Sequence, residues 1–219
     1  MEASDSEVHE VVCARRFELV DEAGTVRAVL GPGPDGGPAL IFATPEGDAR
    51  LVVDLHAEDR PQMVFFNAAG VPRIEFKTDG EGSAALTLRD ESGGARVGIG
   101  IVNEKAAMVQ LFCGTGEAGV MLAADELGNP MIGLNDTSGR PRLLLALEAG
   151  GAPMVEMRDA GERLRANVEL LSDGTPRLTL LNEEEQPRLV ASLDDDGLPT
   201  VLFKDKEGRV ARELPFGDD

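Results

Sequence analysis

The stretch PMIGLNDTSGRPRLLLALEAGGA, residues 130–152, decides the fold, because its pattern returns every 23 positions along the chain. One position of each copy is always apolar, and its occupants are Phe17, Leu40, Met63, Leu86, Val109, Ile132, Val155, Leu178 and Val201. The residues two places further on, from Leu19 to Phe203, are also apolar throughout. Neither series contains an insertion or deletion, so the chain is a tandem array of nine copies.

Each copy predicts a β-hairpin. Asp136 precedes Gly139 by three residues, and an Asp or Asn before a glycine is typical of a tight turn, where the side chain caps the backbone and glycine takes a positive φ. The turn glycine recurs at Gly24, Gly47, Gly70, Gly93, Gly116 and Gly208, with Glu162 and Glu185 in its place in two copies. Apolar residues alternate on both sides of the turn, as in strands with one buried face.

Register follows from the same spacing. Placing Asp21 opposite Val26 puts Leu19 opposite Ala28 and Phe17 opposite Leu30, so both strands send apolar side chains to one face. A second connection usually carries glycine followed by proline at the start of the next strand, where proline costs no interior ladder bond. The sequence therefore predicts an all-β protein of nine 23-residue hairpins, about 18 strands in all.

A lone hairpin is marginally stable, so the copies must bury their apolar residues against one another. This predicts one curled or superhelical antiparallel meander, with Phe17, Phe42, Phe65, Phe76 and Phe203 among its core positions. A parallel β-solenoid with one coil per copy is an alternative, because equivalent residues would then stack in ladders. A many-bladed closed toroid is the other alternative.

The turn segments DTSGRPRLL, residues 136–144, and DKEGRV, residues 205–210, resemble the Asp-x-x-Gly-Arg core of Rhs/YD-type repeats. That resemblance implies a spiralling sheet of hairpins. The nearest description is a bacterial tandem β-hairpin repeat protein of unassigned function.

The repeat bounds the domain organisation. We expect an N-terminal tail over residues 1–15, a single repeat domain over 16–215 and a C-terminal tail over 216–219. Within the first tail, the segment from Val8 to Ala14 looks like half a copy, an unpaired strand that would cap the first hairpin or pair with the last. The acidic start and the lack of a long apolar run predict a cytoplasmic protein without a signal peptide or transmembrane segment.

A formal net charge of -19 makes a nucleic-acid or anionic-membrane partner unfavourable, because both would be repelled. Against this acidic background an arginine follows the turn by three residues in most copies. These candidate binding residues are Arg27, Arg50, Arg73, Arg96, Arg142, Arg165 and Arg188. Aligned guanidinium groups can bind an anionic polymer, but the neighbouring turn aspartates favour structural ion pairs.

Other motifs indicate little chemistry. The segment from Gly114 to Gly119 spells Gly-x-Gly-x-x-Gly, but Gly116 falls on a repeat turn, whereas a dinucleotide site needs a strand followed by a helix. The two histidines, His9 and His56, have no neighbours at metal-ligand spacing. Acidic loops such as residues 194–196 are interpreted as solvated turns, with calcium binding left open. We expect no cofactor, no metal site and no enzymatic activity; a hydrolase using acidic residues in a groove is the minor alternative.

The opposite strand face varies between copies and carries the apolar residues Ile41, Val64, Phe66, Met108 and Phe112. An exposed apolar surface of this kind is typical of a contact with another protein. The sequence therefore predicts a non-catalytic structural or protein-interaction scaffold that binds a protein partner or self-associates. A fibre, shell or toxin-associated segment of a secreted or phage-like assembly is the alternative. A small-molecule ligand is not expected.

Overall fold

The computed structural model describes residues 11–56, 59–148 and 150–215. They divide into two units, residues 1–80 and 81–219, which are considered separately. The described residues form β-strands joined by turns, with no α-helix among them, so the predicted all-β class is confirmed. No helix in this part of the chain has the length and apolarity needed to span a membrane.

The first unit is an antiparallel meander of six strands, each paired with the next along the chain. Its strands are β1 (Phe17–Val20), β2 (Val26–Pro32), β3 (Pro38–Ala43), β4 (Ala49–His56), β5 (Arg60–Phe66) and β6 (Pro72–Thr78).

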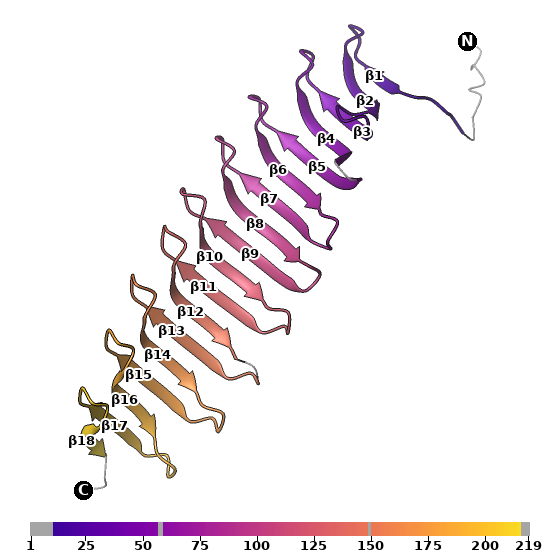
Figure 1. Ribbon diagram of the computed structural model, residues 1–219. Helices are drawn as coiled ribbons and strands as arrows, with labels where there is room; N and C mark the ends of the chain where they lie inside the picture. The colour runs from indigo at the N-terminus through magenta and orange to yellow at the C-terminus, as the bar shows by residue number, and fades with distance from the viewer. Residues whose placement is uncertain (1–10, 57–58, 149, 216–219) are drawn as a thin grey trace, which may run out of the picture. The chain divides into compact units, whose positions relative to one another are not determined.

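The second unit repeats this arrangement over twelve strands, which follow one another in chain order in Figure 1. The strands are β7 (Ala84–Arg89), β8 (Ala95–Val102), β9 (Ala106–Phe112), β10 (Ala118–Ala124), β11 (Pro130–Asn135), β12 (Pro141–Leu147), β13 (Pro153–Arg158), β14 (Leu164–Leu170), β15 (Pro176–Leu181), β16 (Pro187–Leu193), β17 (Pro199–Lys204) and β18 (Val210–Pro215). All pairings are antiparallel and sequential, which confirms the hairpin meander and shows that the parallel solenoid is wrong. Among the described strands of the second unit, β18 pairs with β17 alone, so this part of the sheet ends in an open edge and does not close on itself.

Most turns use one geometry at both ends of the strands; the β8–β9 turn differs, with Asn103 and Glu104 both at positive φ. In the β1–β2 turn, Asp21 donates its N–H to the carbonyl of Thr25, and Gly24 donates to that of Asp21. This is a type I turn followed by a bulge, with Gly24 at a φ of 79°. The Asp21 carboxylate caps the turn by accepting the N–H groups of Ala23 and Thr25. The predicted turn chemistry is confirmed.

The predicted register is confirmed except at its last step. Phe17 lies opposite Leu30 and Leu19 opposite Ala28, as expected. Val20, not Asp21, is the partner of Val26, because a bulge between Leu19 and Val20 absorbs one residue. The pairing of Asp21 with Val26 was wrong because the side chain and N–H of Asp21 belong to the turn.

The sheet in each unit is a single layer among the described residues, and the expected buried core is absent from it. Strands contact only their neighbours, and no second layer covers either face. Buried apolar residues are confined to Ala28, Ala39 and Val64 in the first unit, with exposed fractions of 8, 3 and 5%. Phe17, Phe42, Phe76 and Phe203, predicted as core residues, are all exposed. Pairing alone places the apolar residues on one face, but nothing in either unit covers them.

The tail predictions fall largely outside the described residues. Residues 11–14 belong to no strand, and the rest of the half copy, Val8 to Glu10, lies outside the described part. Residues 216–219 lie outside it as well. The predicted single repeat domain over 16–215 stays a prediction.

Candidate functional site

The predicted arginines tie successive hairpins together. Arg142 on β12 donates its Nε–H to the carbonyl of Arg158 on β13 at 3.0 Å, and its guanidinium lies 3.6 Å from the carboxylate of Asp136. Arg165 on β14 repeats this contact with the carbonyl of Leu181 at 3.1 Å. Each side chain therefore joins its own turn to the end of the first strand of the next hairpin.

The same arrangement recurs at other copies. Arg27 donates to the carbonyl of Ala43, Arg50 to that of Asn67, and Arg188 to that of Asp205. Arg96 adds a favourable charge beside Asp90, one of the interactions that lower the pKa of that carboxyl, after hydrogen bonds from Ser92 and Gly94. Arg73 has polar partners as well. These contacts give the ladder a structural role, while its binding of an anionic ligand stays a prediction.

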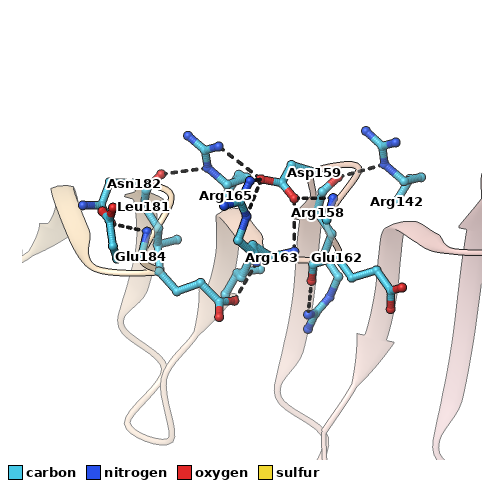
Figure 2. A network of polar contacts seen from close by, with 12 residues as sticks. Arg142, Arg158, Asp159, Glu162, Arg163, Arg165, Leu181, Asn182 and Glu184 are labelled. Atoms are coloured by element: carbon cyan, nitrogen blue, oxygen red, sulfur yellow. Dashed lines mark hydrogen bonds and ion pairs between the residues drawn. The ribbon is translucent and has the colours of Figure 1, made fainter.

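Figure 2 shows the densest part of this network, around Asp159 in the β13–β14 turn. Its carboxylate accepts hydrogen bonds from the side chains of Arg163, at 3.0 Å, and Arg165, at 3.3 Å, and from the N–H groups of Gly161 and Arg163. Removal of solvent raises the pKa of Asp159, but these hydrogen bonds outweigh that effect and lower the pKa to about 2. Asp159 is therefore a charged structural cap.

The fifth copy interrupts the ladder for a steric reason. Gly119 occupies the arginine position, and a Cβ there would lie 2.6 Å from Sγ of Cys113, which replaces the turn aspartate. Gly116 sits in the β9–β10 turn at a φ of 90°, where its N–H bonds to the carbonyl of Cys113. The Gly-x-Gly-x-x-Gly segment is therefore a repeat turn, as predicted.

The most extensive feature of the second unit is an uncharged strand face. Register places three rows of apolar residues on it, and we call these residues the apolar face. Two rows consist of Leu86, Leu88, Val97, Ile99, Val109, Leu111, Val120, Leu122, Ile132, Leu134, Leu143, Leu145, Val155, Met157, Ala166, Val168, Leu178, Leu180, Leu189, Ala191, Val201, Phe203 and Leu214. The third row, toward the strand ends that carry the prolines, consists of Ala84, Ile101, Ala107, Ala124, Pro130, Leu147, Pro153, Leu170, Pro176, Leu193 and Pro199. Many of them remain well exposed, such as Leu111 at 47% and Met157 at 49%. The charged exception within this register is Arg212, opposite Phe203 on the edge strand β18.

The apolar face is hollowed over β11 to β15. The hollow has a volume of about 410 Å³ and lies toward the proline-containing ends of the strands. Its lining includes Pro130, Pro153 and Pro176 at the strand starts, and Leu145 and Val155 in the middle of the face. Glu169, on β14, is the single charged residue of this lining. The lining of the hollow is therefore almost wholly apolar.

Within each unit, the predicted outward residues lie on the face opposite the repeated apolar series, and this opposite face is better covered. Val64 is buried, and Ile41, Phe66, Met108 and Phe112 are partly covered. The prediction assigned the wrong face as the exposed one: long side chains such as the ladder arginines lie on that face, whereas the apolar face carries none to cover it. Whether these five residues bind a partner stays a prediction.

Sequence reasoning missed the apolar face as a surface because it assumed that the repeated apolar series would become a core. A signal was present, since the copies follow one another without a break from Phe17 to Phe203, which leaves no segment between them to form a second layer. Among the described residues no group of three or more His, Cys, Asp or Glu side chains is placed to hold a metal ion. His56 pairs with Asp35 at 3.4 Å.

No protein-family model matches the sequence, and no curated protein matches it either. Solved structures with a similar strand arrangement include a point mutant of the TCP10 domain of Danio rerio CPAP, at 12% identity and a TM-score of 0.42 over 90% of this chain and 98% of that one. The wild-type domain gives 11% identity and a TM-score of 0.31, with 90% and 93% covered. The TCP domain of Drosophila melanogaster SAS-4, solved in complex with a proline-rich motif of Ana2, gives 9% identity and a TM-score of 0.30, with 97% and 96% covered. The resemblance of the turns to Rhs/YD-type repeats stays a prediction.

Proposed function

We propose that the chain is a non-catalytic protein-interaction scaffold whose apolar face is covered by protein in the functional assembly. The observation that carries this is the extent of the face. With strands about 4.8 Å apart and three apolar rows along each strand, the second unit presents roughly 1,100 Å² of uncharged surface. The largest apolar patch on an ordinary monomer is about 300–600 Å². A face of this size is stable in water when another protein covers it.

The network of ladder arginines supports the same function by keeping the face in place. From β11 onward, each hairpin is bonded to the next through the guanidinium group of Arg142, Arg165 or Arg188. These bonds lie at the end of the strands that carries the aspartate-capped turns, here called the turn side, and they keep the apolar rows in register without a core beneath them. The predictions that the chain is not an enzyme, uses no cofactor and is cytoplasmic stay predictions.

The test is photo-crosslinking in the cells that produce the protein. A photoreactive amino acid replaces Leu145, on the apolar face, or Leu144, the next residue of β12, which points to the other face. Covalent protein adducts are expected at position 145 and few at 144. Equal labelling at both positions, or no protein adduct at 145, would contradict the proposed function.

A further inference from the structure

We infer that the apolar face of the second unit is covered by a second copy of the same chain, packed face to face. This inference rests on the proposed function and names the partner. The area is sufficient, because roughly 1,100 Å² per copy exceeds the about 800 Å² per partner of a standard stable interface. The face is also uncharged up to the edge strand, so two copies bring no unpaired charge into its centre.

The shape of the face is self-complementary. The hollow over β11–β15 extends from the middle of the strands to the strand ends that carry the prolines, which we call the proline side. Leu145 and Leu170 are among its lining residues. On the same strands, at the turn side, Met157 projects with 49% of its surface exposed. We place the two-fold axis parallel to the direction in which the strands follow one another. The strands of the second copy then run opposite to those of the first copy that they cover. Met157 of each copy is then brought over the hollow of the other, forming an isologous pair of insertions.

The charges at the two edges select the same axis. From β10 onward, the described residues of the proline-side connections carry acidic charge alone, at Asp125, Glu126, Glu148, Asp173 and Asp194–Asp196. The turn side from the β11–β12 turn onward carries both signs of charge. Arg140, Arg163 and Arg209 pair with Asp136, Asp159 and Asp205, and the ladder arginines lie beside Glu162, Glu183–Glu185 and Glu207, so this edge is close to neutral. Reversed strands place each acidic edge near the almost neutral turn edge of the other copy, whereas strands in the same direction would place acid over acid and increase the repulsion.

Net charge sets the salt dependence. Two chains of formal charge -19 repel each other at long range, and salt screens this repulsion. The self-association is therefore expected to tighten several-fold between 20 and 200 mM NaCl. A cationic partner peptide on the same face would show the opposite dependence.

The first experiment measures mass by sedimentation equilibrium on the full chain. We expect a dimer of 46.4 kDa, twice 23.2 kDa, at micromolar concentration. Leu145→Glu on the apolar face is expected to weaken the dimer at least tenfold, and Leu144→Glu, on the opposite face of the same strand, to leave it intact. Met157→Glu serves as the second variant because this exposed side chain is replaced without disturbing the sheet. Circular dichroism checks that each variant is folded.

The second experiment tests the orientation. With Cys13 and Cys113 replaced by serine, chains carrying Met157→Cys are mixed with chains carrying Leu170→Cys and treated with a short bismaleimide. Cross-links between the two kinds of chain are expected to exceed those between two Met157→Cys chains. The reverse ratio would overturn the two-fold axis, and a dimer sensitive to Leu144→Glu but not to Leu145→Glu would overturn the choice of face.

The outcomes separate this inference from the proposed function. A chain that is monomeric at all concentrations, but forms photo-adducts with a different protein at position 145, overturns the second copy and leaves the scaffold function standing. A monomeric chain without such adducts overturns both. An adduct twice the mass of the chain supports both.

Discussion

At the scale of single residues, the ladder arginines are the best candidates for measurable stability effects. Arg165 bonds the carbonyl of Leu181 in the next hairpin and pairs with Asp159. Its side chain is partly exposed, so we expect Arg165→Ala to lower the free energy of unfolding by about 1 kcal/mol in urea titrations. Lysine at this position is expected to recover less than half, because it lacks the planar fork of donors.

Arg163→Ala is the matched control for this prediction. Arg163 pairs with the same aspartate, but this hydrogen bond and ion pair stay within its own turn. We expect a smaller loss than for Arg165→Ala, because solvent screens an ion pair as exposed as this one. Equal losses in the two variants would show that the bond between hairpins adds nothing.

The Asp159 cap predicts a pH dependence. The pKa of this carboxyl is lowered from 3.8 to about 2 in the folded chain, so its charged form stabilises the fold at pH values above about 4. That contribution is lost as the pH falls from about 4 toward 2. We expect Asp159→Asn to lower the melting temperature at pH 6 and to have little effect at pH 2. A difference that persists unchanged at pH 2 would contradict the assignment.

The sequence indicated these residues better than it indicated their partners. The positions of the turn aspartates and of the arginines follow from the 23-residue spacing, and their pairing was the favoured interpretation. The carbonyl that Arg142 reaches, 16 residues later, was not predictable. It depends on the bulge between Met157 and Arg158, which changes the register by one residue at the end of the strand.

At the scale of hairpins, the turns differ in strain. Glu162 takes the place of the turn glycine at a φ of 64°, a left-handed conformation that side chains rarely adopt. We expect Glu162→Gly to raise the free energy of unfolding by about 0.5–1 kcal/mol. Glycine relieves the backbone strain of the folded state, and part of this gain is lost because glycine increases the entropy of the unfolded chain. Thermal and urea unfolding measure the change.

The reverse substitution is the control. Gly174 has a φ of 86°, and a Cβ there would meet no atom within 4 Å, so only backbone strain opposes Gly174→Ala. A loss of about 1 kcal/mol is expected. Glu185→Gly is expected to gain less than Glu162→Gly, because the Glu185 carboxylate also accepts the N–H of Leu164 at 2.7 Å. Destabilisation by Glu162→Gly would contradict the strain argument.

Strands and turns were predictable from the sequence because they depend on local alternation and turn chemistry. The pairing of Phe17 with Leu30 follows from the spacing and is found in the sheet. Burial was not predictable in the same way, because the alternation of a residue such as Leu122 tells which face it shares and not what covers that face. The exposed apolar face is therefore a property of the assembled strands rather than of any one of them.

At the scale of the whole second unit, strands contact only their neighbours. We therefore predict that one complete repeat can be deleted without unfolding the rest. Deleting residues 130–152 takes out β11 and β12 and joins Asn129 to Pro153, which occupies the same position in its copy as Pro130. After this deletion every remaining strand keeps its direction, and every side chain stays on the same face of the sheet. We expect a folded protein with a cooperative melt shifted by a few degrees, since stability in a repeat array is a sum of local terms.

Deleting half a repeat is the control for that prediction. Removing residues 130–140 joins Asn129 to Pro141 and makes β10 and β12 consecutive, although both run in the same direction in the sheet. Parallel neighbours need a crossover of a dozen or more residues, and the remaining connection is far shorter. We expect the ordered strand content of the second unit to fall sharply by circular dichroism. If both deletions melt alike, the second unit is held together by contacts beyond neighbouring strands, and the additive account of its stability fails.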